Sequence, residues 1–143
     1  MKQIIPEIYI RDCKNALNFY REAFGGEIKN LQMSDSLEMF RDVKNKVIHA
    51  ELHINSRCVC YFVDIFQPKR SKTGNVTIML HLESKEEIKR IYSVLSVDGQ
   101  VEMELQAAFG GAYHAIVTDQ YGAPWALNFA DPILQKGGKW LPV

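Results

Sequence analysis

The chain has 143 residues, of which 47% are hydrophobic and 24% charged, proportions typical of one compact soluble domain or of two small fused ones. Lysine plus arginine equals aspartate plus glutamate at 17 each, so there is no basic excess to neutralise a nucleic-acid backbone. No run approaches the ~20 apolar residues of a membrane-spanning helix, so neither nucleic acid nor a membrane is an expected partner.

The first half of the chain predicts a strand, a helix and three more strands. Asp12 is expected to cap the helix, and Gly25-Gly26 to end it. Segment 34–46 is ambiguous and has room for an edge strand and a charged turn. The expected elements are a strand at 4–10, a helix between Asp12 and Gly25, and strands at 27–33, 47–54 and 58–65.

The second half predicts the same order of elements after a polar, breaker-rich connector. Ser84 with Glu87 forms the signature of a capping box, and Asp98-Gly99 is expected to end the helix. The expected elements are a strand at 76–82, a helix between Ser84 and Asp98, and strands at 101–107, 112–118 and 124–130. The expected modules are 1–66 and 76–131, with a connector at 67–75 and a tail at 132–143 that contains Trp140.

The two halves also repeat short sequence pieces. His49-Ala50 recurs as His114-Ala115, and Phe62-Val63-Asp64 recurs in similar form as Phe129-Ala130-Asp131. A duplicated unit usually buries its core between copies, because one unit cannot cover its own apolar face. The predicted fold class is therefore α+β, with paired βαβββ modules that form an open, mostly antiparallel, barrel-like sheet around a hollow.

The three cysteines, Cys13, Cys58 and Cys60, do not form a disulfide framework. We expect a reduced, cytoplasmic protein in which they are small buried residues. Cys58 and Cys60 have the spacing of a metal-ligand pair, but no second pair completes a structural zinc site.

The strand at 47–54 has two distinct faces. Its even-numbered residues are apolar and should face the helix, whereas His49, Glu51 and His53 should face a pocket or the solvent at its rim. Neighbours on one face lie roughly 6.5–7 Å apart, so they could share a water, a proton or a metal, although all three could not easily bind one ion. The alternative is a structural Glu51, hydrogen-bonded to a histidine of a neighbouring strand.

Further pocket residues come from both halves. The repeat is expected to bring His114 opposite His49, and His81 is expected to look into the cavity. Glu51, His49 and His114 are the candidates for acid–base catalysis, because histidine titrates near neutral pH. The alternative is that these histidines are ordinary polar lining residues and that most aromatic residues are core. The candidate ligand-binding residues are His49, Glu51, His53, Tyr61, His81, Tyr113, His114, Trp125 and Asn128.

Three segments, 16–25, 49–54 and 118–125, resemble the vicinal oxygen chelate superfamily of glyoxalases, bleomycin-resistance proteins and dioxygenases, and in particular its PhnB-like branch. The resemblance implies a cavity in which many members hold a divalent metal. Neither set of positions that it implies here suits zinc, nickel or iron, so no metal and no other cofactor is expected. The two sets are Ile5, Val59, Thr77 and Ala126, or, with the register slipped by two, Glu7, Tyr61, Met79 and Asn128.

The resemblance implies a cytoplasmic homodimer that binds a small organic ligand in its cavity. A metal-independent lyase or isomerase and a resistance-type binding protein both fit, and whether a reaction is catalysed stays open. The alternative function is a divalent-metal enzyme of glyoxalase or dioxygenase type that uses Glu51 with His49 or His114. A third alternative is a scaffold whose pocket is closed by side chains.

Overall fold

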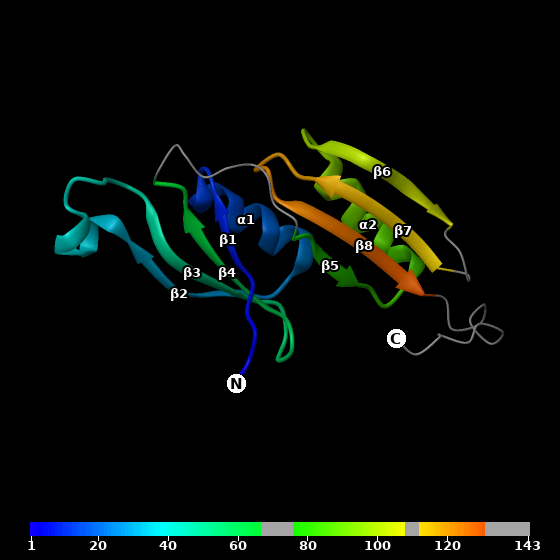
Figure 1. Cartoon of the computed structure of the whole chain (residues 1–143), viewed down its shortest axis with the longest axis horizontal. Helices are drawn as coiled ribbons and strands as arrows, with labels where there is room; N and C mark the ends of the chain where they lie inside the picture. Colours follow the sequence, from blue (N-terminus) through cyan, green and yellow to red (C-terminus); the bar gives the residue numbers. More distant parts are fainter. Residues whose placement is uncertain (67–75, 108–111, 131–143) are drawn as a thin grey trace. The chain divides into compact units, whose positions relative to one another are not determined.

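The computed structural model describes residues 1–66, 76–107 and 112–130, and its contacts divide the chain into two compact units, Met1–Gly74 and Asn75–Val143. Each unit holds a four-stranded mixed sheet and one α-helix, so the α+β class with repeated modules is confirmed (Figure 1). Each sheet is open and is not closed into a barrel. Neither helix of the described ranges has the length and apolarity needed to cross a membrane.

In the first unit, the strand order is β1-β4-β3-β2, with β1 parallel to β4 and the other pairs antiparallel. The first strand is shorter than the sequence predicts, because its pairing with β4 starts only at Glu7. The elements are β1 (Glu7–Ile10), α1 (Cys13–Phe24), β2 (Glu27–Met33), β3 (Val47–His53) and β4 (Val59–Asp64).

The ambiguous segment 34–46 is not an edge strand. It contains two short 3₁₀ helices, η1 (Ser34–Ser36) and η2 (Glu38–Phe40). Ser34 is fully buried, its amide donates to the carbonyl of Lys46 at 2.8 Å, and its hydroxyl accepts from the Lys46 amide at 3.1 Å. These bonds hold the first and last residues of the segment together without a partner strand.

The start of α1 differs from the predicted cap. Asp12 occupies the N-cap position, but its backbone is left-handed (φ 55°) and its side chain makes no capping bond. Asp64, at the end of β4, takes this role instead, since its carboxylate accepts from the amides of Cys13 at 3.0 Å and Val47 at 2.7 Å. One buried side chain thus fixes the first turn of α1 and the first residue of β3.

The core of the first unit lies between α1 and one face of the sheet. Tyr20 and Phe62 are fully buried, and their rings stack with centroids 5.0 Å apart. Phe19 and Phe24 of the same helix are only half-buried. The cysteine prediction is also corrected in part, because Cys60 is buried but Cys58 is exposed.

The second unit repeats this architecture, with strand order β5-β8-β7-β6 and β5 parallel to β8. The aromatic core residue Trp125 is fully buried, and its indole N–H donates to Asp119 at 2.7 Å. The predicted tail with Trp140 and the glycines at 110–111 lie outside the described residues. The elements are β5 (Ile78–His81), α2 (Lys85–Ser96), β6 (Gln100–Ala107), β7 (Ala112–Thr118) and β8 (Pro124–Ala130).

The Ser84 cap of α2 forms as predicted, but the Glu87 carboxylate accepts from the amide of Glu83 at 2.7 Å and not from that of Ser84. This cap gives a first testable expectation. The Ser84 hydroxyl accepts from the amide of Glu87 at 3.0 Å. Ser84→Ala is expected to lower the free energy of unfolding by about 1 kcal/mol in urea titrations. Ser93→Ala, on the exposed side of the same helix, is the control, and an equal loss in both variants would contradict the capping role.

Candidate functional site

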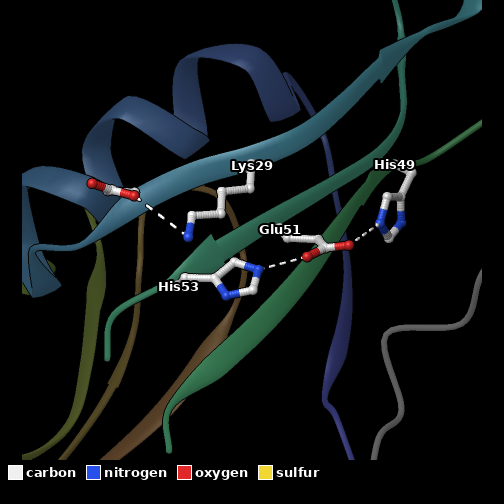
Figure 2. A network of polar contacts seen from close by, with 5 residues as sticks. Lys29, His49, Glu51 and His53 are labelled. Carbon is white, nitrogen blue, oxygen red and sulfur yellow. Dashed lines mark hydrogen bonds and ion pairs between the residues drawn. The ribbon is translucent and has the colours of Figure 1, made fainter. Parts of the chain in front are cut away.

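The candidate site lies on the face of the first sheet opposite to α1. Ala50 and Leu52 of β3 are fully buried toward the helix, and because successive side chains alternate, His49, Glu51 and His53 all lie on the other face. Figure 2 shows Glu51 between the two histidines, with both rings turned toward its carboxylate.

Both oxygens of Glu51 are engaged by imidazoles of its own strand. The distance from Oε1 to His49 Nε2 is 3.1 Å, and that from Oε2 to His53 Nε2 is 2.5 Å. The side chain of Glu51 is 12% exposed, whereas His49 and His53 are 26% and 32% exposed. The expected alternative, in which Glu51 bonds to a histidine of a neighbouring strand, is therefore wrong. The Glu51 carboxylate bonds instead to two histidines of its own strand, which are four residues apart.

These contacts hold Glu51 in its ionised form. Hydrogen bonds from His53, then His49, then the side chain of Asn30 lower the pKa of Glu51 from 4.5 to about 2, against the opposing effect of burial. Asn30 lies on β2 with a left-handed backbone (φ 51°), inside an irregularity of the β2–β3 pairing. No sequence pattern indicates this contact, because it depends on that local irregularity.

The strands beside β3 surround this group with further polar side chains. Across the sheet, Glu51 pairs with Lys29 on β2 and with Tyr61 on β4. The ring of Tyr61 meets that of His49 edge-on at 4.8 Å. Lys29 makes an ion pair with Glu27 at 3.5 Å (Figure 2). We call His49, Glu51 and His53 the β3 triad, since they form the centre of this surface.

The positions that the superfamily resemblance implies for a metal do not suit one. In the first set, Ile5, Val59 and Ala126 offer no side-chain ligand. In the second set, Glu7 lies opposite Tyr61 in the strand register, and its carboxylate already accepts a hydrogen bond from the Tyr9 hydroxyl at 3.1 Å. Within the described ranges no three His, Cys, Asp or Glu side chains converge as metal ligands. The donor set is thus a poor match for a divalent cation.

The second unit has two cross-strand rows of side chains on the face away from α2, and three of the predicted ligand-binding residues lie in one of them. The polar row is His81, Asn128, His114 and Gln106, and the apolar row beside it is Met79, Ala126, Ile116 and Met103. The Asn128 side-chain amide lies 3.2 Å from His81 Nδ1. The structure thus brings His81, Asn128 and His114 together within one unit.

The two predicted aromatic walls of this unit have other surroundings. Trp125 is fully buried in the core with its indole bound to Asp119, which suits a structural residue. Tyr113 is half-buried, stacks on Phe129 at 6.3 Å and lies under the ammonium of Lys85, 4.7 Å from the ring centroid.

A separate depression of about 420 Å³ opens at the amino end of α1. It contains none of the predicted site residues, and its buried acid, Asp64, is already bound to two backbone amides. Its lining residues are Asp12, Lys14, Asn15, Asn45, Lys46 and Asp64.

The lowered pKa of Glu51 predicts a definite pH dependence of stability. A carboxyl whose folded pKa lies below its unfolded value stabilises the fold above about pH 4.5, and this contribution is lost as the pH falls toward about 2. In urea titrations, the stability gap between the wild type and Glu51→Gln should therefore narrow over that range. Glu22→Gln, which removes an exposed carboxylate of α1, is the matched control, and a Glu51→Gln gap that widens on acidification would contradict the assignment.

Comparison with known families agrees with this architecture. The model of the Glyoxalase/Bleomycin resistance protein/Dioxygenase superfamily matches residues 3–127. The chain belongs to this superfamily.

Three similar proteins show how far the likeness extends. Protein YjdN of Escherichia coli K12 is 28% identical over 133 residues, which cover 82% of this chain and 87% of YjdN. The crystal structure of PA1353 from Pseudomonas aeruginosa matches with a TM-score of 0.80 and 27% identity. The match covers 91% of this chain and 98% of the PA1353 chain. A PhnB protein from Bacillus cereus matches with a TM-score of 0.77 and 23% identity. The match covers 90% of this chain and 100% of the Bacillus cereus chain. At 23% identity, the likeness to the PhnB protein concerns the fold alone.

Proposed function

We propose that this member of the superfamily binds a small organic ligand on the helix-free face of its first sheet, at the β3 triad, and that no metal takes part. The observation that supports the proposal is the carboxylate of Glu51, ionised, largely buried and shared by two partly exposed imidazoles. A buried charge is costly, and a polar group that is kept on a sheet face in spite of this cost is a candidate for a binding or catalytic role.

The β3 triad is chemically suited to proton transfer. Imidazoles can exchange protons near neutral pH, and an adjacent carboxylate orients the ring and stabilises its charged form. This arrangement fits a protein that binds its ligand without reaction, and it also fits an isomerase or lyase that transfers a proton. In both cases His49 and His53 contact the ligand and Glu51 lies behind them.

The second candidate function, a metal enzyme that uses Glu51 with His49 or His114, is less well supported. Both carboxylate oxygens already accept hydrogen bonds from Nε2 atoms, so a cation at Glu51 would have to break these bonds and turn the rings. Metal analysis of untagged protein separates the two candidates. Stoichiometric metal that is lost on Glu51→Ala would overturn the metal-free proposal.

A ligand panel tests the proposal itself. Compounds that bind the native state raise the melting temperature, so a thermal-shift screen of small organic molecules identifies binders of the wild type. These compounds should stabilise Glu51→Gln clearly less, and Glu22→Gln as much as the wild type. The absence of any stabilising compound, or equal stabilisation of both variants, would contradict a site at the β3 triad.

We also propose that the protein is a homodimer in the cytoplasm. Within the described parts of the sheets, β2 and β6 are edge strands with largely exposed residues, and open edges favour pairing with another chain. The three cysteines are free thiols, as suits a reducing compartment. Sedimentation at micromolar concentration should give about twice the chain mass of 16.4 kDa, and a single species at that mass would contradict the dimer.

A further inference from the structure

The hydrogen bonds of the β3 triad determine where the imidazole protons lie. An ionised carboxylate can only accept hydrogen bonds, and both contacts of Glu51 are made to Nε2 atoms. Each ring must therefore carry a proton on Nε2. When the ring is neutral, its Nδ1 then has no proton and offers a lone pair.

We propose that Glu51 is a positioning residue that fixes the Nε2–H form of His49 and His53, so that their Nδ1 atoms accept a hydrogen bond from a neutral or cationic ligand with an O–H or N–H group. This inference rests on the proposed function, since it specifies the class of ligand that the same site takes. The hydrogen bonds that the structure gives these two rings use Nε2, which leaves Nδ1 for the ligand.

The charges around the β3 triad favour the same class of ligand. Glu27 and Lys29 face it from β2, where they pair with His53 and Glu51, and Tyr61 and Glu7 face it from β4 and β1. With neutral imidazoles, the three carboxylates Glu7, Glu27 and Glu51 outnumber the ammonium of Lys29 among the described strand residues that face the β3 triad. This surplus of negative charge opposes an anionic ligand and favours a neutral or positive donor.

Tyr61 adds an aromatic surface next to the acceptor. Its ring meets that of His49 edge-on at 4.8 Å, so a ligand that donates to His49 lies beside an aromatic wall. A phenol combines both required features, because it has one O–H donor and a flat ring. Benzoate has a similar size and shape but carries a negative charge and no donor, so it is the matched probe.

The tautomer is tested first, without any ligand. Heteronuclear NMR of isotope-labelled imidazoles in alkaline solution, at about pH 9, should show Nε2–H and a bare Nδ1 for His49 and His53. In Glu51→Gln the amide accepts from one ring and donates to the other, so one ring should move its proton to Nδ1. In Glu51→Ala both rings should become tautomer mixtures, while His114 in the second unit stays unchanged. Tautomer mixtures in the wild type, or no change in Glu51→Gln, would overturn the inference.

The ligand class is tested by titration with phenol and, separately, benzoate, followed through the same nitrogen signals. Phenol should shift Nδ1 of His49 or His53, and its affinity should fall roughly 3- to 10-fold in Glu51→Gln, as expected for one lost hydrogen bond. Benzoate at the same pH should leave Nδ1 unshifted. An equal response to the two probes, or none to phenol, would overturn the ligand class.

Failure of this inference and failure of the proposed function give different results. If panel compounds stabilise the protein through Glu51 while the rings are tautomer mixtures, the positioning role alone is wrong. If the tautomers are fixed but no compound, phenol included, stabilises the protein, both the proposed function and the ligand class are wrong, and Glu51 is a structural residue.

Discussion

Asp119→Ala is expected to lower the free energy of unfolding by about 3–5 kcal/mol, since buried donors left without an acceptor cost about 1–3 kcal/mol each. Asp119 is 3% exposed, and its carboxylate accepts from the amides of Tyr121 and Ala123 at 2.9 and 3.1 Å and from the indole of Trp125 at 2.7 Å. Its loss removes the hydrogen-bond acceptor of the turn before β8 and also that of the buried Trp125 indole. Urea unfolding followed by circular dichroism measures the effect.

Two further variants make this expectation specific. Asp119→Asn keeps one acceptor oxygen and should fall between the wild type and Asp119→Ala. Gln120→Ala, at the exposed neighbouring position, should change the stability by less than about 0.5 kcal/mol. A small loss in Asp119→Ala, similar to that of Gln120→Ala, would mean that the indole and the amides find other partners at little cost.

Phe62→Ala is expected to cost about 3–5 kcal/mol, the usual range for truncating a buried aromatic side chain. Phe62 is fully buried, stacks on Tyr20 at 5.0 Å, and pairs across the sheet with Ile8 and Ala50. Truncation would open a cavity between α1 and three strands. The measurement is again a urea titration, compared at a single temperature.

Phe66→Ala is the matched control for the same chemical change. Phe66 is 37% exposed and meets only the ring of Phe40 in its described aromatic contacts, at 6.0 Å. It should therefore cost clearly less than Phe62→Ala. Equal losses in the two variants would show that burial under α1 is not what makes Phe62 important.

The sequence predicts the architecture well because both modules have regular periodicity. Alternation over 47–54 correctly separates the apolar and polar faces of β3, and the capping box at Ser84 correctly gives the start of α2. Local signals failed where a distant residue takes over a local role. Asp12 has the right residue type for a cap, but Asp64, 51 positions from Cys13, supplies the bond, and only the completed sheet brings it there.

The candidate site shows the same division between local pattern and pairing. The spacing of His49, Glu51 and His53 predicts that they share one face, but it does not predict that one carboxylate bridges both rings. The contributions of Asn30, Lys29 and Glu27 depend on the register of β2 against β3, which contains an irregularity that no sequence period indicates. Likewise, the pairing of His81 with Asn128 follows from the register of β5 against β8.

Chemical-shift mapping of the most stabilising compound tests most directly whether the β3 triad is the ligand site. The account predicts that the largest backbone and imidazole shifts fall on β3 and β4, at His49, Glu51, His53 and Tyr61, and that they are clearly smaller in Glu51→Gln at the same compound concentration. Shifts that concentrate instead around the depression at the amino end of α1, at Lys14, Asn15 and Lys46, and that persist in Glu51→Gln would contradict it.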